Sequence, residues 1–349
     1  MARVWLSLAL CLLLMCAGCS STSEFGNYKI ALVPSRMGQR GIFVMNSDTS
    51  GSRLLTADPN VQLRSCSWSP DGSRIAYFTT RRDDVGMMNK YPIPQHSPLY
   101  VVEVAGKGPK RVLNYPVSSF GWSPDGRKLV VVSAYEDPAH SDSAIYVIDL
   151  QTGEQRRMTS FGKNCSAAWS PDGTHLALSL GDNLTSDVYI TTLDAHGRRI
   201  TDSQTIAITP VWSPNGKKIA YTVMPAPGKE SSDAGVYIVD ADGSQKKRVT
   251  GLSTYGVSWS PDGTKLLLQV IGAVYLVDAE GGDPVKIRVP TNDLLDATFT
   301  PDAEEVMFRS RYEGDWNLYA VDLKSEKCRR LTEQLTAFMF SLSPLLDKH

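Results

Sequence analysis

The sequence predicts an all-β fold, a seven-bladed β-propeller of four-stranded antiparallel blades, and two repeated patterns lead to this prediction. The first is the pentapeptide Trp-Ser-Pro-Asp-Gly or a close variant, which returns every 40 to 54 residues. Its copies begin at Trp68, Trp122, Trp169, Trp212, Trp259 and, in degenerate form, Phe299. The second is a short Val-, Ile- and Tyr-rich line between the copies, as in IYVIDL at 145. Recurrence at this spacing is typical of stacked small units, of which seven can be counted.

Each unit is expected to contain four strands. An apolar strand ends at the Trp, the Ser-Pro-Asp-Gly turn follows, and a strand such as RIAYFTT (74–80) leads through a loop to the Tyr-Val strand. A turn containing Gly then precedes a short basic strand such as KRVT or RRLT. Pro presets the backbone of a type I turn and Gly suits its exit, so the motif favours a tight antiparallel connection. Four such strands indicate a propeller blade.

The two ends of the repeated region predict how the ring closes. The first unit starts with KIALV (29–33) and lacks a Trp-type strand, whereas the chain ends with AFMFSLSP (337–344), a Trp-type strand without its own blade. Pairing these fragments completes the seventh blade and removes two open strand edges. We therefore expect closure by the C-terminal strand. A six-bladed ring with a loose first unit is the alternative.

Composition excludes several classes of protein. The chain has 349 residues, a formal net charge of −1, 42% hydrophobic residues and 21% charged residues. This balance argues against a nucleic-acid interface. The Lys and Arg residues that recur once per unit are interpreted as a solvated outer rim. Because the repeat runs from 28 to 346, we expect one propeller domain and no second folded domain.

The N-terminus has the pattern of a lipoprotein signal peptide over residues 1–18. An apolar run from Val4 to Met15 precedes Ala17-Gly18-Cys19, which is followed by serines. The pattern is typical of secretory export, and it resembles the bacterial lipobox, in which the cysteine carries the lipid. We expect lipidation at Cys19, a tether over 19–27, and anchoring on the periplasmic side of the outer membrane. A plain signal peptide without lipid is the alternative.

Three cysteines lie in the repeated region, at Cys66, Cys165 and Cys328. An odd number spread over the second, fourth and seventh units does not resemble a disulfide framework, even in an oxidising compartment. Cys66 and Cys165 are interpreted as small, buried apolar residues of inner strands.

The repeat resembles that of the TolB-like β-propeller family, which carries a WD40-like PD40 repeat. The resemblance rests on WSPDG followed by an Ile-Ala-Tyr strand, an Ile-Tyr-Val-Asp strand and a closing Leu-Thr, and it covers about residues 28–346. It implies a propeller that binds the peptidoglycan-associated lipoprotein, without the additional N-terminal α/β domain of TolB. Propellers of prolyl oligopeptidase relatives are also similar, but the G-x-S-x-G pentapeptide of their hydrolase domain is absent from this sequence.

Departures from the repeat mark candidate site residues, because what every blade needs recurs and what a site needs does not. The largest departure is an insertion that we expect to form loop 81–98 across one face of the ring; loops of this length are commonly functional. The candidate partner-binding residues are Arg81, Arg82, Tyr91, His96, Tyr135, Glu136, His140, Arg311, Tyr312 and Trp316. Aromatic residues beside arginines dominate protein interfaces. Packing of Tyr312 and Trp316 between blades is the alternative.

These features predict a non-catalytic, lipid-anchored envelope propeller that acts as a monomeric protein-binding scaffold. Its expected partner is an envelope protein or a peptidoglycan-associated component, and no cofactor, catalytic set or nucleic acid is expected. The alternative is a metal-dependent, carbohydrate-active enzyme, because the propeller is also similar to the oligogalacturonate lyases, which hold a metal with histidines. His96 and His140 are the candidate ligands for that metal.

Overall fold

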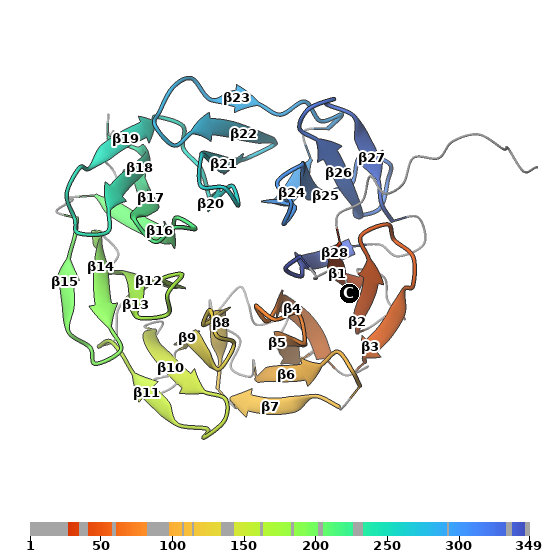
Figure 1. The fold of residues 1–349 in the computed structure, drawn as a ribbon, viewed down its shortest axis with the longest axis horizontal. Helices are drawn as coiled ribbons and strands as arrows, with labels where there is room; N and C mark the ends of the chain where they lie inside the picture. The colour runs from red at the N-terminus through yellow and green to blue at the C-terminus, as the bar shows by residue number, and fades with distance from the viewer. Residues whose placement is uncertain are drawn as a thin grey trace, which may run out of the picture.

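The described part of the chain is an all-β propeller, in which the sheets follow one another around a ring (Figure 1). The computed structural model describes residues 27–34, 41–57, 61–81, 98–106, 108–113, 115–133, 143–160, 163–182, 185–201, 205–225, 233–291, 293–332 and 337–345. In these segments no helix is long and apolar enough to cross a membrane.

Five sheets contain four strands each. One has the order β28-β1-β2-β3, with β28 at Ala337–Leu342, β1 at Lys29–Pro34, β2 at Ile42–Asn46 and β3 at Arg53–Thr56. The next contains β4 (Val61–Trp68), β5 (Arg74–Arg81), β6 (Leu99–Glu103) and β7 (Lys110–Leu113). The third contains β8 (Val117–Trp122), β9 (Lys128–Ser133), β10 (Ala144–Asp149) and β11 (Gln155–Arg157). The last two contain β20 (Gly256–Trp259), β21 (Lys265–Val270), β22 (Ala273–Asp278) and β23 (Val285–Lys286), and β24 (Leu294–Phe299), β25 (Glu305–Ser310), β26 (Asn317–Asp322) and β27 (Cys328–Arg330).

The remaining strands form a single eight-stranded sheet. Its strands are β12 (Lys163–Trp169), β13 (His175–Gly181), β14 (Ser186–Thr192), β15 (Gly197–Arg199), β16 (Ile206–Trp212), β17 (Lys218–Met224), β18 (Gly235–Asp240) and β19 (Lys247–Thr250). The first four and the last four meet through one parallel bridge, between Ser186 of β14 and Ile206 of β16.

The predicted count of seven separate four-stranded blades is therefore wrong, and so is the alternative of six. The structure has five four-stranded sheets, and the other strands share the eight-stranded sheet. The physical reason is local: Ser186 N donates to Thr205 O at 3.1 Å, which brings the backbones of two successive repeats into bonding distance. Repeat counting cannot reveal such a bridge, because it involves backbone atoms and no special residue type.

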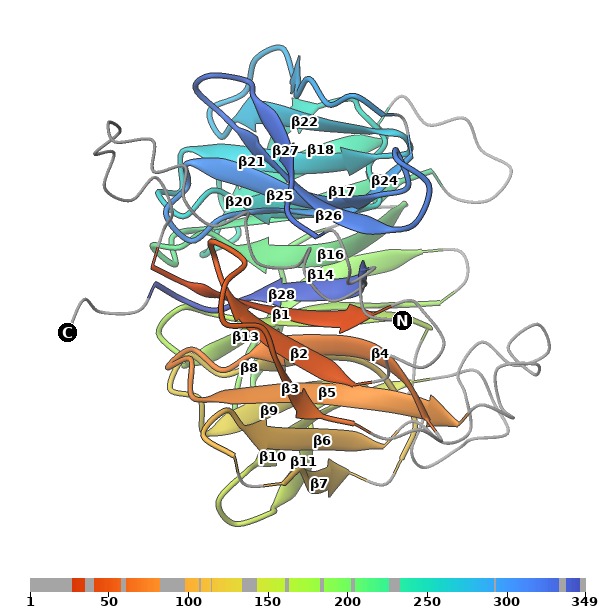
Figure 2. The same ribbon diagram turned by 90° about the vertical axis from the view of Figure 1, so that its right-hand side faces the viewer.

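The sheet that contains the two ends of the described chain is formed by segments far apart in sequence. β28 pairs with β1 in antiparallel register, with Ile30 opposite Leu342 and Leu32 opposite Phe340, and the two strands lie side by side in Figure 2. Beyond the ladder, Ser343 N donates to Lys29 O at 2.8 Å. The last strand therefore covers an edge of the first one, which would otherwise expose unpaired backbone groups.

The ring has two faces with different connections. The Trp-Ser-Pro-Asp-Gly turns join the strand nearest the centre to the next strand, and we call the face that carries them the turn face. Antiparallel strands reverse direction at each step, so the loops between second and third strands, and the segments leading to the next repeat, lie on the opposite face. We call this the connection face. The loops from β25 to β26 and from β21 to β22 belong to it.

The repeated turn is held by its own polar atoms. In the turn at 170–173, Ser170 Oγ donates to Asp172 Oδ1 at 2.5 Å, and the Thr174 amide donates to the same oxygen at 3.0 Å. Gly173 N donates to Ser170 O at 2.9 Å. Gly173 has a φ of +71°, a conformation that costs little for glycine. The residues of the motif therefore supply the hydrogen bonds and the backbone conformation that form this turn.

The tryptophans of the motif tie neighbouring repeats together. In four of them the indole Nε1–H donates to a backbone carbonyl of the inner strand in the preceding sheet. The accepting residue comes directly before the last residue of that strand, which is the position of the motif tryptophan. These bonds are Trp68 to Ser341 at 3.2 Å, Trp122 to Ser67 at 3.1 Å, Trp169 to Gly121 at 3.3 Å and Trp259 to Val211 at 3.1 Å. Trp212 Nε1 is buried and has no partner among the described residues. This exception falls in the eight-stranded sheet.

The core lies between adjacent sheets. One cluster joins Ala31 and Val44 to Trp68 and Tyr77, and the next joins Ala76 to Trp122 and its neighbours. Cys66 is buried in the first cluster, as interpreted from the sequence, and burial raises the pKa of its thiol to about 12. Cys66 and the half-buried Cys328 are free thiols. The side chain of Cys165 lies outside the described residues, as do the predicted signal peptide 1–18 and Cys19.

We expect removal of residues 337–349 to abolish cooperative folding. The deletion exposes the edge of β1 and removes the Ser341 carbonyl that accepts the Trp68 indole N–H. A chain that ends at Leu345 keeps every described strand and serves as the control. Size-exclusion chromatography and thermal unfolding measure the result. A monomeric truncated protein with a cooperative transition would show that the β1–β28 pairing is dispensable.

Acid should weaken the repeated turns. The hydrogen bond from Ser170 and the bond from the Thr174 amide lower the pKa of Asp172 from 3.8 to about 2, and the Ser260 hydroxyl likewise lowers the pKa of Asp262. Because the folded-state pKa is depressed, the contribution to stability is present above about pH 4 and is lost as the pH falls toward 2. The double variant Asp172→Asn/Asp262→Asn should flatten the decline in stability across this window.

The turn at Asn215 shows that asparagine can replace aspartate in this motif. In the natural Trp-Ser-Pro-Asn-Gly turn, Asn215 Oδ1 accepts from Ser213 Oγ at 2.9 Å and from Lys217 N at 3.0 Å. An amide therefore preserves the turn while removing the titration. Urea unfolding at a series of pH values measures the slope, and a variant as acid-sensitive as the parent chain would contradict this origin. Because both carboxylates are largely solvated, the effect should stay below about 1 kcal/mol each.

Candidate functional site

Charged and aromatic side chains gather on the connection face, around β24, β25 and the start of β26. It comprises Asp293, Asp296, Arg309, Arg311 and Trp316, and we call it the arginine–tryptophan cluster. Arg309 lies opposite Leu295 in the β24–β25 ladder, one residue from Asp296. The cluster therefore depends on the register of two strands and on the loop that follows them.

A β-bulge brings Asp296 to Arg309. The register shifts between Leu295 and Thr298, and Asp296 has a φ of +54°. Aspartate tolerates this left-handed conformation better than most residues. Arg309 Nε donates to Asp296 Oδ2 at 2.6 Å, and Arg309 Nη2 contacts the same oxygen. The arginine side chain is 8% exposed and the aspartate side chain 50% exposed, so a buried cation meets a carboxylate that opens to solvent.

Trp316 contacts two guanidinium groups. The Cζ atoms of Arg309 and Arg311 each lie 5.1 Å from the centroid of its ring, within the range of cation–π attraction. Arg311 Nε also donates to Asp293 Oδ2 at 2.8 Å, and both side chains of that pair are about half exposed. The indole is thus held in place by charged groups that are themselves paired with carboxylates.

Exposed apolar and aromatic side chains lie on the same face of the ring as the cluster. Tyr312 is 52% exposed, Tyr255 44%, Leu295 37% and Ile271 91%. Burial raises the pKa of Tyr255, and so does the negative charge of Asp296, which places the phenol close to the cluster. Gln269 connects the two sheets here, because Ala297 N donates to Gln269 Oε1 at 3.0 Å. The result is a surface of aromatic rings beside arginines, rimmed by paired charges, as in many protein interfaces.

The structure places only some of the predicted site residues. Arg311, Tyr312 and Trp316 lie together in and beside the cluster, with Tyr312 exposed and Trp316 half-buried. Arg81 ends β5, but its side chain is outside the described residues. Outside them too are Arg82, Tyr91, His96, Tyr135, Glu136 and His140, so the predictions for these residues stay predictions.

Sequence reasoning missed the two carboxylates and Tyr255. The sequence repeat could have indicated Asp296, which stands three residues before Phe299, the residue that replaces the motif tryptophan. The corresponding residues before the motif tryptophans are small or hydroxylated, namely Ser65, Ser119, Ser166, Thr209 and Gly256. A carboxylate at this position is thus a departure of the kind that marks a site. Tyr255 carries no comparable signal, since its importance follows from the approach of two sheets.

The cluster contains paired charges and shares its face of the ring with exposed aromatic side chains. Within the described segments, no group of three His, Cys, Asp or Glu side chains is placed to hold a metal. The charged groups of the arginine–tryptophan cluster are paired with one another, and three of them, Asp293, Asp296 and Arg311, are about half exposed beside exposed aromatic and apolar side chains. Such a surface favours docking of another macromolecule.

Fold and surface together define a β-propeller with an interface-like connection face. The chain belongs to the family of the TolB β-propeller domain, whose model matches residues 87–271 and 198–341. It is 39% identical over 111 residues to the Tol-Pal system protein TolB of Alcanivorax borkumensis, a match that covers 31% of this chain and 23% of that relative. The chain thus matches about a quarter of the length of this relative.

Two solved structures support the fold. TolB from Acinetobacter baumannii is similar over 92% of this chain and 68% of its own, with a TM-score of 0.57 and 16% identity. An oligogalacturonate lyase in complex with manganese is similar over 82% of this chain and 84% of its own, with a TM-score of 0.64 and 17% identity. Identity at this level shows a shared fold alone, and one fold can host different functions.

We expect the buried and the exposed ion pairs of the cluster to differ in their effect on stability. Asp296→Asn should lower the free energy of unfolding by about 2 kcal/mol, because it leaves the buried Arg309 without its carboxylate. Asp293→Asn, the matched control, should cost less than about 0.5 kcal/mol, because its pair with Arg311 is half exposed. Urea unfolding measures both. Equal, small effects would show that water solvates Arg309.

Proposed function

We propose that this protein is a non-catalytic scaffold of the cell envelope that binds a partner protein through the connection face. The observation that carries the proposal is the arginine–tryptophan cluster, in which Trp316 is fixed by Arg309 and Arg311 while Tyr312 and Tyr255 stay exposed. Ordered aromatic side chains bind partners at a low entropic cost, because little side-chain freedom remains to be lost.

The proposed partner is the peptidoglycan-associated lipoprotein. Support comes from membership in the TolB β-propeller family and from the relative whose name places TolB in a Tol-Pal system. The lipobox-like start of the chain supports export and lipid attachment at Cys19. A lipid-anchored scaffold would meet such a partner in the same compartment. The whole of this assignment, including a monomeric state, is our proposal.

We expect substitutions in the exposed part of the surface to weaken partner binding without unfolding the protein. Trp316→Ala should weaken binding of the purified, soluble form of the peptidoglycan-associated lipoprotein from the same organism by about 30-fold, or ~2 kcal/mol. Tyr312→Ala should weaken it about fivefold, since a rim residue contributes less than a central one. Isothermal titration calorimetry measures the dissociation constants.

Arg288→Ala is the control. Arg288 is more exposed than Arg311, and its ion pair with Glu326 lies outside the cluster. The affinity of this variant should equal that of the unmodified chain. Wild-type affinity in the Trp316→Ala protein would refute the surface, and absence of binding in the unmodified chain would refute the partner. Stoichiometric metal together with cleavage of oligogalacturonate, both lost in a His96→Ala variant, would instead establish the lyase alternative.

A further inference from the structure

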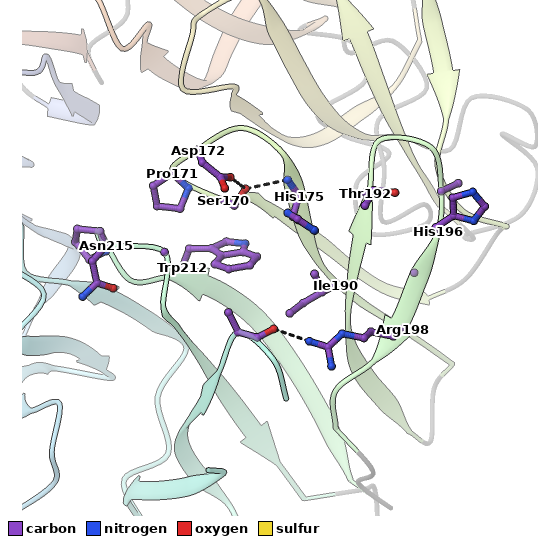
Figure 3. Close-up of a pocket in the computed structure, with 15 residues that line it drawn as sticks. Ser170, Pro171, Asp172, His175, Ile190, Thr192, His196, Arg198, Trp212 and Asn215 are labelled. Carbon is purple, nitrogen blue, oxygen red and sulfur yellow. Dashed lines mark hydrogen bonds between the residues drawn. The ribbon is translucent and has the colours of Figure 1, made fainter. Parts of the chain in front are cut away.

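The junction between the first four and the last four strands of the eight-stranded sheet departs from the repeat pattern. On the connection face the junction is closed tightly: Ser179 Oγ and Ser186 Oγ both donate to the Ala207 carbonyl at 2.8 Å, beside the bridge from Ser186 to Ile206. On the turn face the same junction opens into a pocket of about 890 Å³ (Figure 3). The pocket is within the ~300–1,000 Å³ that small-molecule sites usually have.

The residue that follows the turn differs in type beside the pocket. In the second sheet, Arg74 follows the turn and reaches the next repeat, where its Nη2 donates to Gly126 O at 2.7 Å and its Cζ lies 5.1 Å from the Trp122 ring centroid. His175 stands at the corresponding position beside the pocket. Its Nδ1 lies 2.7 Å from Thr174 Oγ1, within its own turn. His175 therefore does not make across this junction the contact that Arg74 makes across its own.

The two walls of the pocket carry hydrogen-bonding groups that the protein does not use. His175 and Trp212 come from the two facing halves of the sheet and project into the space between them (Figure 3). Trp212 Nε1 and Thr192 Oγ1 have no partner among the described residues, but both atoms are shielded from solvent inside the walls and do not face the open space. Asp172 and Asn215 each accept the hydrogen bonds of their turn with Oδ1. Asp172 Oδ2 therefore remains as an acceptor, and Asn215 Nδ2 remains as a donor.

The charges around the pocket favour neither an anion nor a cation. Asp172 lines it on one side and Arg198 on the other (Figure 3). The two Nη atoms of Arg198 donate to the carbonyls of Ala241 and Asp242. Because Asp172 and Arg198 carry opposite charges, they give the pocket no excess of one sign. A ligand with hydroxyl groups, each able to donate and to accept, matches a mixed set of this kind.

An extended peptide fits the pocket less well. Peptides that bind propeller-like sheets as an added strand need a free strand edge with unpaired N–H and C=O groups. This pocket lies between the faces of two halves of a sheet, so side chains line it. The flat Trp212 ring beside scattered donors and acceptors is instead suited to the C–H face and hydroxyls of a sugar ring. We propose that the pocket binds a short neutral oligosaccharide. The site lies on the turn face, opposite the docking surface, and does not depend on the proposed function.

The test is calorimetric titration of the purified protein with three neutral disaccharides, cellobiose, maltose and N,N′-diacetylchitobiose, and with digalacturonate as the charged counterpart. We expect millimolar or tighter binding of at least one neutral disaccharide, and binding of digalacturonate at least tenfold weaker. Failure of all three neutral sugars to bind would overturn the proposal, and so would tighter binding of digalacturonate.

Two variants locate the site without disturbing the fold, because each restores a residue type found in the other repeats. Asn215→Asp reproduces the usual turn but replaces the free Nδ2 donor with a carboxylate, and His175→Lys reproduces the basic residue of Lys128, Lys218 and Lys265. Each should weaken sugar binding at least tenfold at an unchanged Tm. Asp262→Asn makes the reverse turn substitution outside the pocket and should bind as the unmodified chain does. Equal binding by all four proteins would place the sugar elsewhere and refute the pocket.

Discussion

The hydrogen bond from the indole of one repeat to the backbone of the preceding inner strand is the interaction on which the ring depends. Trp122, Trp169 and Trp259 each make it, and Trp68 makes it to Ser341, across the gap between the ends of the chain. The same rings fill the core between sheets. One side chain therefore sets both the spacing and the orientation of neighbouring repeats, since a large apolar ring needs the contact and its buried N–H needs a partner.

The same constraint explains why the ring is irregular where it is. At Trp212 the indole bond is missing, and the repeats on either side are connected instead by serine hydroxyls and a backbone bridge at the opposite face. This junction lacks the indole bond on the turn face and has the serine hydrogen bonds on the connection face. A pocket on the turn face is the geometric result. The repeat thus keeps its fold although Trp212 does not make this bond and Phe299 and Leu342 have no indole to make it.

The repeated motif allowed the strands and turns to be predicted because each of its residues has a local physical role. Ser170, Asp172 and Gly173 form their turn with contacts inside five residues, which is a distance over which sequence is informative. The eight-stranded sheet was beyond such reasoning, because Ser186 and Thr205 meet through backbone atoms. The candidate site was predictable where side chains depart from the repeat, as at Trp316 and Arg311. It was not predictable at Tyr255, whose role depends on the distance between two sheets.

The pairing of Lys29 with Ser343 joins residues separated by 314 positions in the chain. In biosynthetic terms, β1 is made long before its partner, because one edge of β1 has no neighbour until Ala337–Leu342 has been synthesised. Contacts of such long sequence separation are slow to form and leave strand edges unprotected in the meantime. Chaperones that hold the chain before closure would therefore protect the N-terminal repeat above all others.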